Sequence, residues 1–312
     1  MRAGRSRLIF TAGWIAALCT GLAFGVFGAS RTYHVQETVT FINDGPGECT
    51  QLKIVIGLFR DWAPYIDVLS ESISPSSYRV TSDDFGNRFA ELVLRDVPRG
   101  TRIPITIDWQ IEVADLAFDL EDHDDSEIPE EIARWLDSEP FIESTDPSIV
   151  LQANDLACGR EGPGEIVEAI YDHVTSSIRY EGHVAEPQGA LYCLRNQQGD
   201  CTEFAALMTA LCRAAGIPAR MIEGVTNRAE DEVHSWMEAY LPGLGWIPFD
   251  PTWGRHPGER EKYLAAITPD HIPLVIGIDL DALGGYSYWA YWYWWESQST
   301  SISITGYDWD VR

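Results

Sequence analysis

The sequence predicts an α+β protein in which an all-β region precedes a region that combines helices with a β-hairpin. Between Tyr33 and Val113 apolar and polar residues alternate, which is the pattern of half-buried antiparallel strands. Beyond Glu165 the apolar residues recur every three to four positions, which is the pattern of amphipathic helices. The chain has 312 residues, enough for about two domains.

The alternation is clearest from Ile103 to Val113, where every second residue is apolar. A second run, from Leu52 to Leu58, alternates in the same way, and a weaker one covers residues 31–41. Clusters of glycine, asparagine and aspartate separate these runs, as expected of turns between strands. We therefore expect a β-sandwich domain over residues 31–115.

An acidic segment follows this domain. Six carboxylates lie between Asp119 and Glu127, but they lack the glycine and the terminal glutamate of a helix–loop–helix calcium site. A solvated linker over residues 116–150 is the better interpretation, with a mixed α/β domain over 151–265 after it. Residues 266–312 form a C-terminal aromatic-rich extension.

The extension contains eight aromatic residues in the ten positions from Tyr286 to Trp295. Such a segment suits a sugar-stacking or membrane-interface surface, and it equally suits an aromatic strand that closes over the core. We favour the second interpretation and expect the extension to pack on the core.

The N-terminus has the composition of a targeting segment. Three arginines stand among the first seven residues, and an uncharged run from Leu8 to Gly28 follows them. Val26 and Gly28 suit a signal-peptide cleavage site, but the run is also long enough to span a bilayer. Residues 1–30 are thus expected to be a signal peptide or a membrane anchor, and the rest of the chain to be extracytoplasmic.

The charge balance argues against a nucleic-acid partner. With 48 acidic and 22 basic residues the formal net charge is -26, and such a surface repels phosphate backbones. Of six cysteines, Cys19 lies in the apolar run. If one of the other five stays free for chemistry, four can pair; buried unpaired thiols are the alternative. No cysteine pair has zinc-ligand spacing, so neither a metal nor another cofactor is expected.

One cysteine stands where a helix is expected to begin. In the segment from Gly199 to Pro218, Asp200 can cap the helix, Glu203 can complete a capping box, and Gly216 ends it. Cys201 then takes the first helical position, where the free backbone N–H groups and the helix dipole favour a thiolate. The same groups can stabilise an oxyanion.

A histidine and an aspartate lie on the predicted hairpin. Two strand-like runs flank the turn sequence Pro-Gly-Leu-Gly, and a turn centred on residues 242–244 sets His234 nearly opposite Asp250. Facing residues have Cβ atoms about 4.5–5.5 Å apart. The carboxylate can therefore orient one ring nitrogen and leave the other for a thiol, the logic of nucleophilic acyl transfer.

Three sequence blocks resemble the transglutaminase-like superfamily of papain-like thiol enzymes. They are Gly-Asp-Cys before a helix that ends in Gly-Ile-Pro-Ala-Arg, His-Ser-Trp at the start of a strand, and Trp-x-x-x-Asp-Pro-Thr at the end of another, within residues 166–254. The resemblance implies a papain-like transglutaminase core, in which a helix carrying Cys201 packs on an antiparallel sheet carrying His234 and Asp250. Members of the superfamily commonly have a β-sandwich before this core.

The resemblance also implies residue roles. Cys201 is expected to be the nucleophile, His234 the base and Asp250 the residue that orients the base. The superfamily's upstream oxyanion-stabilising side chain has three candidates here, Tyr180, Gln188 and Gln198. Two tryptophans are expected as walls of the cleft, Trp236 and Trp246.

The expected activity is acyl transfer from an amide or peptide through a thioester, with a protein or peptide as substrate. Hydrolysis by a peptidase or amidase is favoured over amine transfer by a cross-linking transglutaminase, because the triad serves both reactions and water is always present. A non-catalytic binding or scaffold protein on the same fold is the third alternative.

Overall fold

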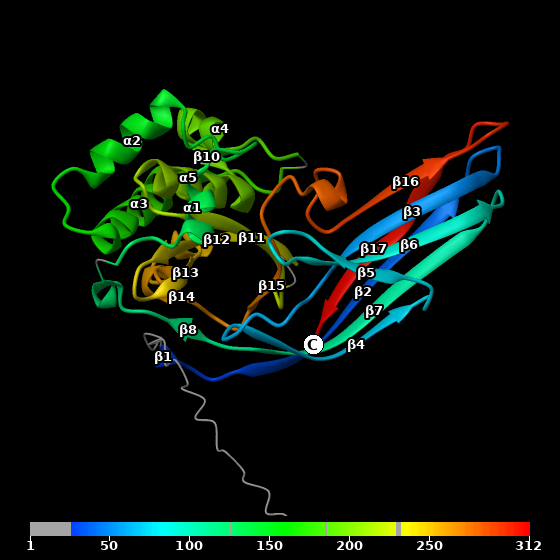
Figure 1. Cartoon of the computed structure of the whole chain (residues 1–312), viewed down its shortest axis with the longest axis horizontal. Helices are drawn as coiled ribbons and strands as arrows, with labels where there is room; N and C mark the ends of the chain where they lie inside the picture. Colours follow the sequence, from blue (N-terminus) through cyan, green and yellow to red (C-terminus); the bar gives the residue numbers. More distant parts are fainter. Residues whose placement is uncertain (1–25, 125, 185, 229–231) are drawn as a thin grey trace, which may run out of the picture.

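The computed structural model describes residues 26–124, 126–184, 186–228 and 232–312. The expected signal peptide or anchor at residues 1–30 lies almost entirely outside these residues. Within them, none of the helices has both the length and the apolar character that crossing a membrane requires. Helices gather at one end of the molecule and long strands at the other (Figure 1), so the α+β class is confirmed.

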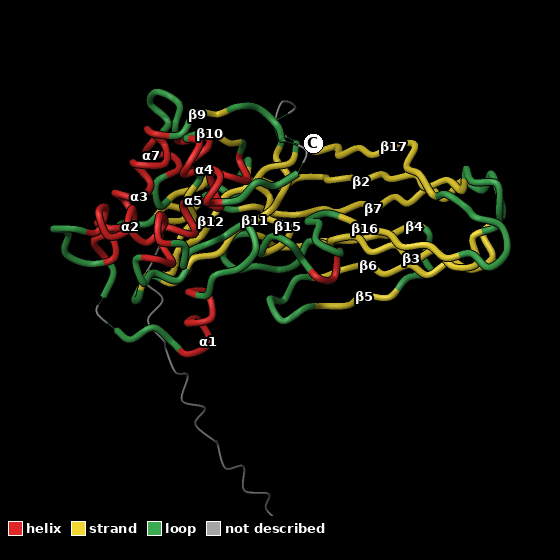
Figure 2. The backbone as a smooth tube through the Cα atoms, turned by 90° about the horizontal axis from the view of Figure 1, so that it is seen from above, coloured by secondary structure: helices red, strands yellow, loops and turns green. Residues whose placement is uncertain are grey.

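The strand-rich end is a sandwich of two four-stranded antiparallel sheets, which Figure 2 shows as long layers of strands running away from the helices. The first sheet has the order β16 (Trp289–Trp294), β3 (Cys49–Leu58), β6 (Arg88–Val97) and β5 (Arg79–Ser82). The second has the order β17 (Ile302–Val311), β2 (Arg31–Asn43), β7 (Arg102–Val113) and β4 (Ile66–Ser74).

Alternation in the sequence explains the sandwich core. In β7 the residues at every second position from Ile103 to Val113 are buried, and β2 alternates in the same way over most of its length. Each strand thus presents one apolar face to the opposite sheet, as in other aligned sandwiches.

The C-terminal extension contributes an edge strand to each sandwich sheet. β16 pairs with β3, and β17 pairs with β2, although more than 200 residues separate each pair of strands in sequence. The aromatic segment is thus a strand of the sandwich.

A third four-stranded antiparallel sheet lies between the sandwich and the helices. Its order is β13 (Gly245–Phe249), β12 (Val233–Leu241), β11 (Ala219–Thr226) and β15 (His271–Ile276). Every residue of β11 is buried, because helices pack on one face of this sheet and sandwich residues on the other. The predicted hairpin around Pro-Gly-Leu-Gly is confirmed as β12 and β13.

The helical end contains α2 (Pro147–Ala157), α3 (Pro163–Ser177), α4 (Ala190–Asn196) and α5 (Cys201–Ala214), with the short α6 (Pro251–Gly254) and α7 (Arg260–Tyr263). Helix α5 is the central one, since residues 203–212 along it are all buried. It packs on α2, α3, α4 and β12.

Minor elements complete the chain. The segment 116–150 holds β8 (Leu116–Ala117), two 3₁₀ turns (Leu120–Asp122 and Arg134–Leu136) and α1 (Glu130–Ala133). A third 3₁₀ turn lies at Asp281–Leu283. The remaining strands are β1 (Val26–Phe27), β9 (Arg179–Tyr180), β10 (Gln198–Gly199) and β14 (Ala266–Ile267). Domain boundaries within the chain stay a prediction.

All five cysteines of the described residues are free thiols. Cys49, Cys193 and Cys212 are buried, Cys158 is exposed and Cys201 is half-buried. The structure thus has the buried unpaired thiols that were the alternative to disulfide pairing.

Candidate active site

Cys201 is the first residue of α5, as its sequence predicts. The Asp200 carboxylate accepts the backbone N–H of Thr202 at 2.8 Å, and the Glu203 carboxylate accepts the N–H of Asp200 at 3.1 Å. Asp200 also accepts the N–H of Glu203, which completes the capping box. Gly216, in the left-handed region with φ of 83°, lies just beyond the other end of the helix. The position of Cys201 is therefore fixed by local sequence signals.

The capping carboxylates also hold a loop beside the thiol. The N–H of Val184 donates to Asp200 at 2.8 Å, and the N–H of Gln188 donates to Glu203 at 2.8 Å. Burial is the main cause that raises the pKa of Glu203 to about 7. The helix terminus and this loop thus form one wall around Cys201.

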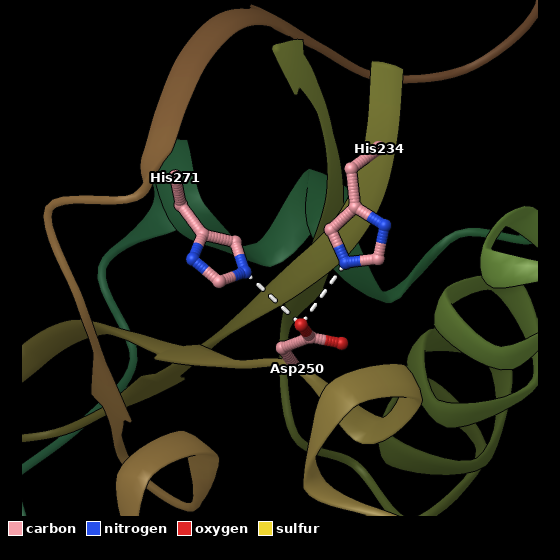
Figure 3. Close-up of side chains that lie close together, drawn as sticks. All are labelled: His234, Asp250 and His271. Atoms are coloured by element: carbon pink, nitrogen blue, oxygen red, sulfur yellow. Dashed lines mark hydrogen bonds and ion pairs between the residues drawn. The ribbon is translucent and has the colours of Figure 1, made fainter. Parts of the chain in front are cut away.

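His234 contacts Asp250 through a buried hydrogen bond. The His234 Nε2 lies 3.0 Å from Asp250 Oδ2, and its other ring nitrogen points away from the carboxylate (Figure 3). The interaction with the Cys201 side chain is one of the causes that raise the pKa of His234. The three side chains therefore lie in the order thiol, imidazole, carboxylate.

The hairpin turns at residues 242–244, as expected, and His234 lies nearly opposite Asp250. Met237 faces Phe249 across β12 and β13, so the position opposite Asp250 is that of Trp236, two residues from His234. Asp250 follows the last residue of β13 and caps α6. The imidazole and the carboxylate meet diagonally on one face, a contact that long side chains can make in an antiparallel pair.

The Asp250 carboxylate has four hydrogen-bond donors. Its Oδ1 accepts the backbone N–H groups of Thr252 at 2.8 Å and Trp253 at 3.1 Å. Its Oδ2 accepts from His234 and, also at 3.0 Å, from the Nε2 of His271 (Figure 3). Both imidazoles must carry their proton on Nε2 to donate in this way, which leaves the Nδ1 of His234 as the basic nitrogen.

Sequence reasoning missed His271, the first residue of β15. A single histidine at the start of an apolar run gives no signal of a partner elsewhere in the chain. Its side chain is fully buried, and burial is the main cause that lowers its pKa. His271 is therefore a neutral donor to Asp250.

The electrostatics of the buried pair follow from these contacts. Burial opposes the charged form of His234, but the Asp250 charge, its hydrogen bond and the contact with Cys201 outweigh burial and raise the pKa of His234 to about 10. Burial likewise opposes the Asp250 carboxylate, but His234 and His271 lower its pKa below the ordinary value. The carboxylate thus stays ionised and the imidazole holds a proton readily.

Aromatic rings hold both imidazoles in place. Trp253 stacks on His234 with centroids 4.7 Å apart and an interplanar angle of 20°, and it also contacts His271 at 4.2 Å. The guanidinium of Arg228 lies over the Trp253 ring, 3.6 Å from its centroid. Such packing restricts the histidines to the orientation that their hydrogen bonds require.

His234, Asp250 and His271 are also the one group of potential metal ligands among the residues that the structure describes, with donor atoms within 4.8 Å of one another. Both imidazoles use Nε2 to donate to Asp250, whereas a metal ligand must offer that nitrogen without its proton. The observed hydrogen bonds therefore fit a proton-holding cluster better than a metal site.

Cys201 and His234 border a cavity of about 930 Å³. Its other polar lining includes Thr202, Ser235 and Glu223. The Glu223 carboxylate accepts hydrogen bonds from Ser235 at 2.9 Å and from the Tyr288 hydroxyl at 3.3 Å. Burial is the main cause that raises the pKa of Glu223 to about 8. Sequence reasoning did not identify this carboxylate as part of the site.

The three candidates for an upstream oxyanion side chain do not reach this cavity. The Tyr180 ring lies under the Arg255 guanidinium, 4.3 Å from it. The Gln188 amide donates to a backbone carbonyl of its own loop at 2.9 Å. The Gln198 amide contacts Arg179 and the Tyr192 hydroxyl.

Neither of the expected cleft-wall tryptophans borders the cavity. Trp236 is fully buried and lies 6.1 Å from the His234 ring. Trp246 packs against Trp135 and Tyr240, with the Arg220 guanidinium 3.9 Å from its centroid. Both rings lie on the face of the hairpin that the sandwich covers, so both pack with the sandwich core. The aromatic wall comes instead from the C-terminal segment.

Replacing His271 by phenylalanine is expected to lower turnover about tenfold, because it removes one charge-assisted hydrogen bond from Asp250 and keeps the ring volume. The pKa of Asp250 should rise, since His271 is one of the groups that lower it. The acid limb of the pH–rate profile should therefore move to higher pH. His271→Gln retains an N–H donor and is the matched control. Equal profiles for wild type and both variants would contradict a positioning role.

Part of the chain matches a known protein family. Residues 152–251 match the transglutaminase-like superfamily. The chain is 35% identical over 78 residues to the uncharacterized protein YebA of Bacillus subtilis strain 168, and 34% identical over 79 residues to a protein-glutamine gamma-glutamyltransferase of Pseudomonas aeruginosa PAO1. These matches cover 20% and 22% of this chain but only 11% and 12% of the relatives.

A solved structure shares the whole fold. A proposed cysteine protease of Cytophaga hutchinsonii superposes with a TM-score of 0.70 over 93% of this chain and 92% of its own, at 18% sequence identity. At that identity the likeness establishes the architecture, sandwich included. Residues 152–251 of this chain are therefore a core of the transglutaminase-like superfamily.

Proposed function

We propose that this protein is a thiol-dependent amide or peptide hydrolase that acts through a thioester on Cys201. The observation that carries the proposal is that His234 interacts with Cys201 on one side and with the buried Asp250 on the other, while Cys201 and His234 border a cavity. In this scheme the Nδ1 of His234 takes the thiol proton, and Asp250 holds the resulting imidazolium. An imidazolium beside a sulfur stabilises the thiolate.

The thiolate then attacks the carbonyl carbon of an amide, and His234 returns the proton to the leaving amine. Asp200 already accepts the backbone N–H groups of Thr202 and Glu203. The N–H of Cys201 itself is thus the helix-terminal donor left for the oxyanion. One such preorganised donor contributes about 10²–10³-fold to the rate.

Water is the acceptor that the cavity favours. A transferase must shield its thioester from water while it admits an amine. The expected wall tryptophans Trp236 and Trp246 do not border the cavity, and the tryptophans that do, Trp289 and Trp292, belong to β16 of the sandwich. Around Cys201 the lining carries hydroxyl and carboxyl groups, from Thr202, Glu223 and Ser235.

Amine transfer is the second candidate, because the matched part of the Pseudomonas aeruginosa relative belongs to a protein-glutamine gamma-glutamyltransferase. The two reactions share the thioester and differ only in the acceptor. Either one makes a protein or peptide the acyl donor. If the N-terminal segment exports the chain, that donor is extracytoplasmic.

In the test, the purified full-length protein is incubated with casein as substrate, once with and once without a fluorescent primary amine. We expect released ammonia or new peptide N-termini, little fluorescent label, and complete loss of both products in Cys201→Ala. Cys201-dependent incorporation of the amine without cleavage or deamidation would show that the protein is a transferase.

A further inference from the structure

The cavity that holds Cys201 continues along the open edge of the β-sandwich. Beyond the thiol, its lining residues come from β16, β17 and the segment before β16. β16 and β17 are edge strands, one in each sandwich sheet, and both belong to the strand-rich end of the molecule (Figure 1). A single cavity therefore connects the candidate nucleophile with the aromatic C-terminal segment.

Three aromatic rings form a ladder along this cavity. Trp289, Tyr291 and Tyr293 occupy alternate positions of β16, and each faces an apolar residue of β3. Their ring centroids follow one another at 6.2 and 6.3 Å. An extended polypeptide presents its same-face side chains about every 6.6–6.8 Å. A peptide that runs along β16 can thus place successive same-face side chains against successive rings.

Contacts with β2 and β17 fix the orientation of the rings of the ladder. Phe41 of β2 packs edge-on against Trp289 and Tyr291, with centroid distances of 6.2 and 5.2 Å. The Tyr291 hydroxyl donates to the backbone carbonyl of Ile302 at 3.1 Å, across the gap between the two sheets. Rings that are ordered before binding lose little conformational entropy when a ligand arrives.

The chemistry of the lining selects an apolar ligand. Ile302, Ile304 and Tyr307 of β17 border the cavity opposite the ladder. No lysine or arginine is among the described residues that line it, and its carboxylates (Glu186, Asp200, Glu203 and Glu223) lie in the part that surrounds the thiol. Acidic ligands therefore have no basic partner there. The unpaired edge of β16 offers backbone groups to an extended chain.

We propose that this groove binds an extended polypeptide segment with apolar side chains at alternate positions, and so delivers a neighbouring amide of the same chain to Cys201. The assignment rests on the proposed function, because an amide-cleaving thiol makes a polypeptide the expected occupant. The aromatic extension is then the specificity element of the enzyme.

The test measures binding separately from chemistry, in the full-length Cys201→Ala protein. The probes are two fluorescein-labelled nonapeptides of equal composition, one with leucine alternating with serine and one with the leucines grouped together. We expect the alternating peptide to bind at least about tenfold more tightly. Tyr293→Ala should weaken its binding about tenfold, as loss of an aromatic contact predicts.

Trp294→Ala is the matched control, since Trp294 is on the same strand and 46% exposed but does not border the cavity. It should bind like the parent. If Tyr293→Ala fails to fold, Tyr286→Ala replaces it, because Tyr286 borders the cavity and is 59% exposed; a several-fold loss is expected. Equal affinity for the two peptides, equal loss in Trp294→Ala, or displacement of the peptide by chitohexaose would overturn the assignment.

The two proposals can fail separately. Tight, Tyr293-dependent binding together with no cleavage by the wild type would count against the hydrolase and leave the peptide groove in place. Cleavage of casein by the wild type with no preference between the nonapeptides would leave the hydrolase in place and refute the groove.

Discussion

Cys201→Ala is expected to lower the rate of amide cleavage by at least about 10⁴-fold, because removing the nucleophile of a covalent mechanism leaves only binding and oxyanion stabilisation. The fold should be retained, since Cys201 is only half-buried and its helix is capped by Asp200 and Glu203. The rate is measured with the casein assay on purified full-length protein, and the fold by circular dichroism.

Cys158→Ser and Cys212→Ala are the matched thiol controls. Cys158 is exposed, and Cys212 lies on the same helix as Cys201 but is fully buried, which raises its pKa to a range where the thiolate is scarce. Both variants should keep the wild-type rate per folded molecule. If Cys201→Ala retained a tenth of the activity, or Cys158→Ser lost it, the nucleophile would have to be sought elsewhere.

Asp250→Asn is expected to lower turnover about 10³- to 10⁴-fold, through the tautomer of His234. The asparagine oxygen can still accept the N–H groups of Thr252 and Trp253, so its amide nitrogen faces the histidines and donates to them. His234 must then accept on Nε2 and carry its proton on Nδ1, where it cannot take the proton of Cys201. Iodoacetamide alkylation of Cys201 should slow with turnover.

The same variant changes how stability depends on pH. His234 has a pKa raised to about 10 from an ordinary 6.5, so its stabilising effect is complete below about 6.5 and is lost as the pH rises to 10. Asp250 has a lowered pKa, so its effect is present above the ordinary value of 3.8 and is lost on acidification. The pair therefore stabilises most between these limits.

Urea unfolding of wild type and Asp250→Asn should thus differ most near pH 5–6 and least near pH 10. In the variant, burial acts on His234 without the opposing carboxylate, so the pKa of its ring, followed by NMR, should fall well below 10. A pKa that stays near 10, or a stability difference that grows towards pH 10, would refute the assigned charge pairing.

The parts of the fold that the sequence could predict are those determined by neighbouring residues. Capping by Asp200 and Glu203, the left-handed Gly216 and the turn around Gly243 act over a few residues, so the position of Cys201 and the hairpin follow from them. Alternation likewise predicts β7 without knowledge of its partners, because it depends only on one face being buried.

The parts that could not be predicted depend on pairing between distant segments. The aromatic run at residues 286–295 has the composition of a buried strand, but nothing in it names β3 as its partner. The same holds for His271, whose role exists only because β15 pairs with β11 and so reaches Asp250. Trp236 and Trp246 do not form the expected walls, because the sequence does not say that the sandwich covers their face of the hairpin.

The proposed mechanism requires a thioester on Cys201, which mass spectrometry of the acid-quenched reaction with casein can detect. We predict that a peptic fragment containing Cys201 carries an acyl group derived from casein and that hydroxylamine removes this group. The adduct should accumulate when the reaction is run at low pH, where hydrolysis of the thioester is slower. Product release with no adduct on Cys201, or with the acyl group on Cys158 or another thiol, would rule out Cys201 as the nucleophile.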